Sequence, residues 1–158
     1  MKKSMKVFMR EDAKTEEVVM APGPSNMLDE NGKPIVLEIK VLSATTLANI
    51  SENYTQRHMA TDNKGRPYIQ NGEVAYRVTK DNRKATGHIL AEALVYPDLK
   101  DPELMKFFGA VDISEMAGKV FPRTDELEHV NRVVLSALGL NRAPDAADTT
   151  QELNDLKN

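Results

Sequence analysis

The 158-residue sequence contains no cysteine and no tryptophan, and only 5% of its residues are aromatic. The lack of cysteine excludes disulfides, thiol catalysis and cysteine-ligated zinc, and it is compatible with a reducing compartment. With so few aromatic residues, the core has to be built from aliphatic side chains and methionine. The net charge of −3 argues against sequence-independent binding to nucleic acid, which requires clustered lysine and arginine.

Long apolar runs and catalytic motifs are also missing. No run approaches the roughly 20 apolar residues of a membrane span, and residues 7–9 are too short for the apolar core of a secretion signal. The three histidines, His58, His88 and His129, fall on three different predicted helices and lack the spacing of a metal motif. The sequence shows no phosphate loop, no nucleophile elbow and no internal repeat. We therefore expect no catalytic residue, no cofactor, no metal and no membrane contact.

Two antiparallel strands are predicted near the start of the chain, over residues 16–20 and 35–41. Prolines end the first strand, and the Asn-Gly pair before the second readily adopts the positive φ of a tight turn. Alternation in the second strand gives it one apolar face. A second Asn-Gly pair, at residues 71–72, predicts a smaller hairpin, although a helical interpretation of residues 73–80 remains open.

Capping residues and apolar spacing predict several helices. The first runs from the caps at residues 43–46 to about Met59, before the Asp-Asn-Lys-Gly of residues 62–65. The next begins after Asp81 and reaches about Tyr96, where the following proline stops it.

Three more helices are predicted from their starting residues. Asp101 caps a short helix whose first residue is a proline, which costs nothing at that position. Asp112 and Glu115 have the spacing of a capping box. Thr124 caps the last helix, which Gly139 ends.

The apolar residues beside these caps predict how the helices pack. Leu104, Phe107 and Phe108 form the buried face of the helix after Asp101. Val111 and Met116 occupy the two positions of a hydrophobic staple.

These elements predict an α+β fold, with N-terminal antiparallel β-hairpins followed by a mainly helical half of three to four short helices. We expect one domain over residues 1–140, β-rich over 16–80 and helical over 81–140. Residues 141–158 lack apolar periodicity and are predicted to be a flexible acidic tail.

Methionine is the residue type that suggests binding. Flexible, polarizable methionine side chains are over-used on surfaces that bind variable apolar partners. The methionines outside the predicted helical core are candidates for such a surface: Met5, Met9, Met20, Met27 and Met59. The carboxylates of Asp98 and Asp101 are assigned to a turn and a helix cap rather than to catalysis.

The run Ile89-Leu90-Ala91-Glu92-Ala93-Leu94-Val95-Tyr96-Pro97-Asp98-Leu99-Lys100-Asp101-Pro102-Glu103-Leu104 resembles the signature of a phage tail assembly chaperone family. That family occurs in Gram-positive phages, prophages and phage-like elements. The order of the later elements, residues 107–111, Met116 and the helix of residues 127–140, fits the family. Upstream, residues 31–34 and the strand that follows resemble its Gly-Lys-Pro element, whereas residues 57–80 depart most from it.

The resemblance implies a chaperone that is not an enzyme. Such a protein binds the tape measure protein, a long and largely helical chain, and keeps it soluble until tail tube subunits polymerise around it. It is then released, so the expected location is the host bacterial cytoplasm and not the mature virion. The resemblance also implies a homo-oligomer, contact with the tail tube protein, and a longer form made by ribosomal frameshifting.

A structural tail component, such as a terminator or connector, is the alternative hypothesis. A small enzyme or nuclease is a third, which the missing motifs disfavour. For client binding or self-association we name apolar residues of the helical half: Leu94, Leu104, Phe107, Phe108 and Leu127. The competing interpretation of each is an ordinary core residue.

Overall fold

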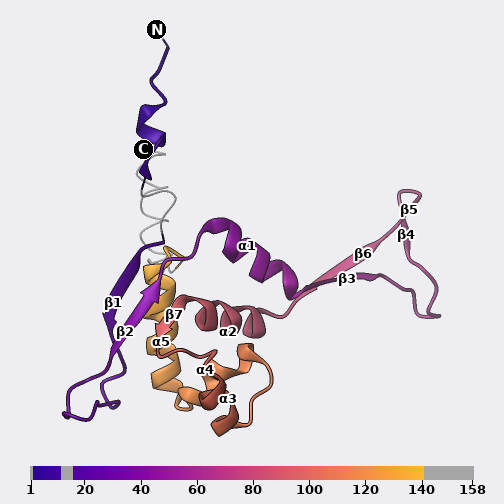
Figure 1. The fold of residues 1–158 in the computed structure, drawn as a ribbon. Coiled ribbons are helices and arrows are strands. Elements are labelled where there is room, and N and C mark those ends of the chain that lie inside the picture. Colours follow the sequence, from indigo (N-terminus) through magenta and orange to yellow (C-terminus); the bar gives the residue numbers. More distant parts are fainter. Residues whose placement is uncertain (1, 12–15, 141–158) are drawn as a thin grey trace, which may run out of the picture.

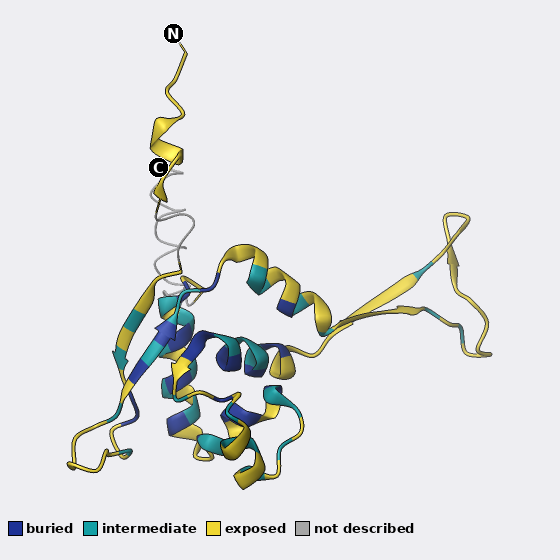
Figure 2. Cartoon of the chain, in the orientation of Figure 1, coloured by how far each residue is buried: buried dark blue, intermediate teal, exposed yellow. Residues whose placement is uncertain are grey.

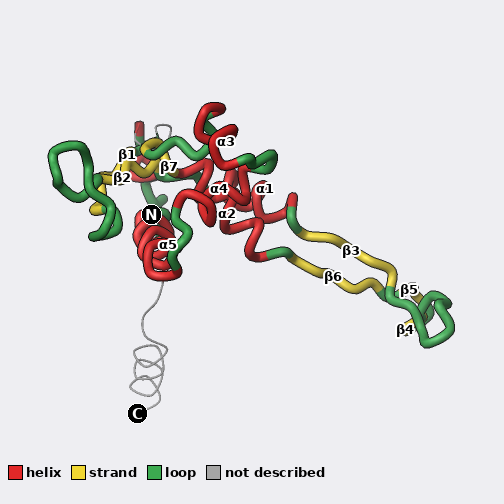
Figure 3. Tube along the Cα trace, turned by 90° about the horizontal axis from the view of Figure 1, so that it is seen from below, coloured by secondary structure: helices red, strands yellow, loops and turns green. Residues whose placement is uncertain are grey.

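The chain has the predicted mixed α+β fold, with antiparallel strands before a mainly helical C-terminal half (Figure 1). The structure, a computed structural model, describes residues 2–11 and 16–140. Residues 16–54 and 81–140 pack together into what we call the body. Residues 55–80 form a long β-ribbon, the arm, which projects away from the body (Figure 1, Figure 3).

The two predicted N-terminal strands are confirmed as β1 (Val18–Pro22) and β2 (Val36–Lys40), which pair antiparallel. Alternation places Leu37 and Ile39 on the inner face, where both are fully buried. The first strand continues beyond its predicted end as far as Pro22. A proline is tolerated there because it occupies the last position of an edge strand.

The helix that follows Asp81 is shorter than predicted. Helix α2 (Asn82–Ala93) ends where β7 (Leu94–Tyr96) begins, so the prediction that it reaches Tyr96 is wrong. Strand β7 instead pairs with β2 and completes a sheet of order β1-β2-β7. Leu94 of β7 pairs with Ile39, which lies far away in the sequence, so local spacing cannot reveal this strand.

Helix α1 (Ala44–Asn53) begins as predicted, with the Ser43 side chain accepting a hydrogen bond from the Thr46 N–H at 3.1 Å. The predicted continuation to Met59 is wrong. Helix α1 ends at Asn53, and strand β3 (Thr55–Met59) follows after a single residue.

The arm consists of two antiparallel pairs of strands. Strand β3 pairs with β6 (Tyr76–Lys80), and β4 (Ile69–Gln70) pairs with β5 (Glu73–Val74). The small hairpin at the second Asn-Gly pair is confirmed, and both of its turn residues have positive φ. The helical interpretation of residues 73–80 is wrong, as is the placement of His58 on a helix.

The corner after β7 is built as the sequence predicts. The Asp98 carboxylate accepts the Lys100 N–H at 3.0 Å, and the Asp101 carboxylate accepts the Leu104 N–H at 2.8 Å. Helix α3 (Pro102–Phe108) therefore starts at Pro102, with Asp101 as its N-cap residue. The Tyr96–Pro97 peptide bond is cis, and Leu99 anchors the corner with no exposed surface.

Asp112 is an N-cap residue as predicted, but the capping box with Glu115 and the staple of Val111 and Met116 are wrong. The chain first makes a 3₁₀ turn, η3 (Ile113–Glu115), and then α4 (Met116–Val120), so the Asp112 carboxylate accepts the Ser114 N–H at 2.9 Å. This tighter turn leaves the Val111 side chain 95% exposed, away from buried Met116.

Helix α5 (Thr124–Ala137) is capped one residue earlier than predicted. Arg123 is the N-cap residue, and its N–H donates to the Glu126 carboxylate at 3.3 Å. Thr124 is therefore the first helical residue rather than the cap. The helix ends as predicted, with Gly139 at φ 72°.

The core lies where the sheet, α2 and α5 meet, and the arm contributes nothing to it (Figure 2). Its largest fully buried side chains are aliphatic residues and methionine together with one phenylalanine: Phe121, Leu37, Ile39, Leu90, Leu99, Met116, Val130 and Val134. Met116 thus fills the core. Every strand residue of the arm is exposed.

The predicted flexible tail, residues 141–158, lies outside the described residues, so the domain boundary at residue 140 stays a prediction. Within the described ranges, none of the helices combines the length and the apolar character required to span a bilayer.

Candidate interaction surfaces

Many large apolar side chains lie outside the core. Sixteen apolar residues are buried in the core, whereas nineteen large apolar residues of the described ranges are exposed. Contiguous apolar surface that stays in contact with water marks sites of protein interaction. The exposed residues gather on the arm, on the outer face of the sheet, around η1 (Lys6–Phe8) and at α3.

The arm has one apolar face and one polar face. In the register of β3 and β6, Met59 lies opposite Tyr76 and Arg57 lies opposite Val78. Residues opposite each other on antiparallel strands point to the same side, so these four side chains share a face. The polar face carries their neighbours: Gln56, His58, Arg77 and Thr79.

The apolar face is open to solvent but ordered by its own contacts. Tyr76 is 52% exposed, Val78 is 63% exposed and Met59 is 48% exposed. The Arg57 guanidinium lies 4.2 Å above the centre of the Tyr76 ring, a cation–π contact that places a positive charge on this face. The face therefore presents apolar surface beside a fixed cation.

The arm differs in charge from the body. Residues 55–80 contain five basic residues, Arg57, Lys64, Arg66, Arg77 and Lys80, and two acidic residues, Asp62 and Glu73. The arm thus carries +3, as residues 1–15 do, whereas the body, residues 16–54 and 81–140, carries −7. A partner with acidic groups is therefore favoured at the arm and disfavoured at the body.

The root of the arm is held to the body by contacts of Tyr54 and Asp81. The Tyr54 carbonyl accepts the Asp81 N–H at 3.0 Å, which closes the ribbon where it leaves the helices. The Tyr54 hydroxyl and the His88 Nδ1 are hydrogen-bonded at 2.8 Å, and the two rings meet edge to face. The Asp81 carboxylate also caps α2 through the Lys84 N–H. The arm is therefore held at its base while its faces stay free.

The expectation of no internal repeat is wrong at one point, because two loops of the molecule share one construction. Residues 28–34, Leu-Asp-Glu-Asn-Gly-Lys-Pro, join β1 to β2, and residues 61–67, Thr-Asp-Asn-Lys-Gly-Arg-Pro, lie in the arm. In both, the first and last residues form an isolated bridge, and the aspartate N–H donates across the loop at 2.7 Å. Each aspartate carboxylate accepts two N–H groups, and each glycine has positive φ. The shared pattern Asp-x-x-Gly-[Lys/Arg]-Pro could have revealed this repeat.

Hydrogen bonds of the loop lower the pKa of the Asp62 carboxyl below its usual value. The largest cause is the Arg66 N–H, followed by the Lys64 N–H, because both stabilise the charged form. The Arg66 Nε also donates to this carboxylate at 3.1 Å. The loop in the arm is therefore held by an ionised carboxylate at neutral pH.

The outer face of the sheet is a second apolar surface. Val18, Met20, Val36 and Tyr96 are each about half exposed. Charged residues lie beside these apolar ones. Glu38 is paired with Met20 on one side and with Tyr96 on the other, and Lys40 forms an ion pair with Glu16 at 3.2 Å. Met5, Met9 and Met59 are exposed as well, whereas Met27 is half-buried against the core.

The structure does not bring the five predicted surface residues together. Leu94 is 3% exposed and lies in the core. Leu104, Phe107 and Phe108 stand on α3, and the predicted buried face there is wrong for Phe107, which is 81% exposed. Phe107 contacts Phe108 edge to face at 5.0 Å between ring centres, while Leu104 and Phe108 pack against the core. Leu127 lies apart, on α5.

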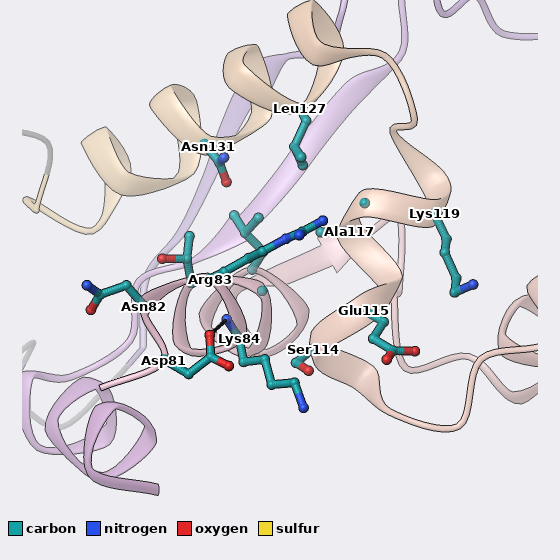
Figure 4. Close-up of a pocket in the computed structure, with 14 residues that line it drawn as sticks. Asp81, Asn82, Arg83, Lys84, Ser114, Glu115, Ala117, Lys119, Leu127 and Asn131 are labelled. Carbon is teal, nitrogen blue, oxygen red and sulfur yellow. Dashed lines mark hydrogen bonds between the residues drawn. The ribbon is translucent and has the colours of Figure 1, made fainter. Parts of the chain in front are cut away.

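Leu127 lines an open groove of about 850 Å³ between α2, η3, α4 and α5 (Figure 4). Leu127 and Asn131 point into the groove from α5, and the Arg83 side chain extends across it toward Ala117. The Oδ1 atom of Asn131 is buried and has no hydrogen-bond partner among the described residues. The lining mixes both signs of charge, including Asp81, Lys84, Glu115 and Lys119.

The described residues contain no cluster of three or more histidine or acidic side chains that could hold a metal ion. Two of the histidines have structural contacts: the His129 Nε2 lies 2.8 Å from the Pro22 carbonyl, and His88 contacts Tyr54. The pKa of the Asp112 carboxyl is lowered, and the largest cause is the hydrogen bond that it accepts from the Ser114 N–H. We therefore assign the hydrogen bonds of His129, His88 and Asp112 to stabilisation of the fold.

Comparison with known proteins identifies a family. The model of the family described as phage XkdN-like tail assembly chaperone protein matches residues 5–152. Among solved structures, the crystal structure of the protein YqbN is similar, with a TM-score of 0.64 and 17% sequence identity. The similarity covers 88% of this chain and 98% of that chain, and at this identity it demonstrates a shared fold. No curated protein matches the sequence.

Proposed function

The chain belongs to the phage XkdN-like tail assembly chaperone family, and we propose that it binds the tape measure protein and keeps it soluble until the tail tube polymerises around it. The resemblance noted in the sequence is thereby confirmed at the level of the family. Tape measure binding, solubilisation and release are the finer parts of the proposal.

The observation that carries the proposal is the amount of apolar surface that the fold leaves open. A protein that must cover a long apolar helical chain needs accessible apolar side chains of its own. More large apolar residues are exposed in the described ranges than are buried in the core. Several weak contacts, repeated by many copies along one long client, would add up to stable coverage.

Co-expression with the tape measure gene of the same phage tests the proposal. The soluble fraction of the tape measure protein is compared with and without the chaperone, at matched total expression. We expect the client to be soluble only when the chaperone is present. A client that is equally insoluble, or equally soluble, in both cultures would refute the assignment.

Release after assembly requires its own measurement. We propose that the protein acts in the host cytoplasm, contacts the tail tube subunit transiently and self-associates while it covers the client. Quantitative mass spectrometry of purified particles should then find few or no copies relative to the tail tube protein. Copies present in a fixed ratio to the tube would instead indicate the alternative, a structural tail component.

A further inference from the structure

We propose that the apolar face of the arm is the docking site for an acidic amphipathic helix of the client protein. The inference rests on the proposed function and adds to it the surface used and the chemistry of the segment bound. Its occupant is one helical segment, with acidic residues beside its apolar stripe.

The arm is not required for the fold of the body. No residue between 55 and 80 belongs to the core cluster or to the partly buried residues packed against it. A two-stranded ribbon is marginally stable in water unless another element covers one of its faces. Within the described ranges, no element packs on Met59, Tyr76 or Val78, all of which are exposed. The arm therefore presents an apolar face that a partner can cover.

The dimensions of this face fit one helix. Neighbouring strands lie about 4.8 Å apart, so a helix about 10 Å in diameter covers both strands of the ribbon. The strands β3 and β6 contain five residues each. At about 3.3 Å per residue they extend about 16 Å, the length of about 11 helical residues at 1.5 Å per residue. Three turns of an amphipathic helix would therefore match the face.

The charge of the arm selects an acidic helix. Arg57 lies on the apolar face itself, above Tyr76, and Lys80 lies on the same face at the root. The arm carries +3 while the body, residues 16–54 and 81–140, carries −7. An acidic segment is consequently attracted to the arm and repelled by the body, which favours docking on the arm over docking on the body.

A pair of arginine substitutions tests the proposal with a matched control. Arg57→Glu and Arg77→Glu change the charge of the arm by the same amount, but Arg57 lies on the apolar face and Arg77 lies on the polar face. Both residues are exposed strand residues of the arm, outside the core. A general effect of charge would be equal in the two variants, whereas docking on the apolar face would not.

The probe is a set of overlapping peptides that tile the tape measure sequence, with binding measured by fluorescence anisotropy against the full chain. We expect tight binding by acidic peptides that become helical when bound, and weaker binding at higher salt. Arg57→Glu should weaken that binding about tenfold, and Arg77→Glu should weaken it by much less. Unchanged binding by Arg57→Glu, equal losses in both variants, or a preference for basic or extended peptides would overturn the proposal.

Deletion of the arm separates this inference from the proposed function. Because the Tyr54 carbonyl and the Asp81 N–H already meet at 3.0 Å, residues 55–80 can be replaced by a two-glycine linker. If the wild-type chain solubilises the tape measure protein and the deletion does not, the docking site is supported. If both solubilise it, the arm is not the site, although the chaperone assignment stands. If neither does, the assignment fails and the docking proposal fails with it.

A second copy of the chain is the competing occupant of the apolar face. Size-exclusion chromatography with light scattering compares the wild type with the Tyr76→Ser/Val78→Thr variant, which keeps strand-compatible residues. The proposal predicts the same oligomeric state for both and loss of peptide binding for the variant alone. A change of oligomeric state with peptide binding intact would overturn it and assign the face to self-association.

Discussion

The body and the arm of this chain use apolar residues for opposite purposes. In the body, Leu37, Leu90 and Phe121 come from separate segments of the chain and are at most 1% exposed. In the arm, Tyr76 and Val78 stand on a regular ribbon and remain exposed. Folding and docking are thus assigned to different parts of the molecule. A chaperone gains from that separation, because its binding surface can be free or occupied without disturbing the fold.

The largest expected difference between the two regions is in the cost of removing an aromatic side chain. Phe121→Ala should lower the free energy of unfolding by about 3–5 kcal/mol, because Phe121 is fully buried in the core. Tyr76→Ala should change it by no more than about 0.5 kcal/mol. Urea denaturation followed by circular dichroism measures both. Similar losses in the two variants would mean that the arm is part of the cooperative fold.

Two glycines of the body provide the next test. A Cβ atom on Gly87 would lie 2.0 Å from the Ser114 carbonyl oxygen, so Gly87→Ala should force α2 and η3 apart and cost about 1–3 kcal/mol. Gly118→Ala is the matched control, because nothing lies within 4 Å of its Cβ position. In α4 that control should stabilise the protein by about 0.5–1 kcal/mol. Thermal unfolding that ranks the two variants in the reverse order would contradict the packing described for η3.

A smaller effect is expected from the cap at Asp112. The pKa of its carboxyl is lowered in the folded state, chiefly by the Ser114 N–H, so the stabilisation is present above the usual value of 3.8. That stabilisation is lost as pH falls below about 4 toward the lowered pKa. Asp112→Asn keeps an acceptor but cannot titrate, so its unfolding midpoint should fall less than that of the wild type over the same range. Parallel curves for the two proteins would refute this role.

The smallest effects compare the same loop in the two regions. Asp29→Ala removes the carboxylate that holds the loop between β1 and β2, so it should cost the body about 0.5–1 kcal/mol. Asp62→Ala removes the equivalent carboxylate in the arm, where faster amide exchange at Lys64 and Arg66 is expected without a shift of the unfolding midpoint. A lowered midpoint for Asp62→Ala would show that the arm is coupled to the body.

Local hydrogen bonding explains which parts of the fold could be predicted. The caps at Ser43, Asp81 and Asp101 bond to N–H groups three residues away, so their sequence spacing is sufficient to find them. The β1–β2 pair is predictable for a similar reason, since its turn and its alternation lie within one short segment.

Pairing between distant segments explains the main errors. The spacing of Leu94 continues the apolar stripe of α2 and predicts a helix there, but Leu94 pairs with Ile39 in the sheet. Local spacing predicts a helix that ends near Met59, because Tyr76, its partner in the arm, is far away in the sequence and gives no local signal of a strand. Without that register the apolar face of the arm cannot be predicted, and apolar spacing alone points to the helical half as the candidate surface.

Amide hydrogen exchange on the free chain and on its complex with a tape measure fragment tests the separation of body and arm most directly. We predict that amides of residues 55–80 become protected on binding, while those of α2 and α5 keep their exchange rates. If binding instead protects amides of the sheet, of α3 or of the groove beside α5, while those of the arm keep their exchange rates, the assignment of docking to the arm is contradicted.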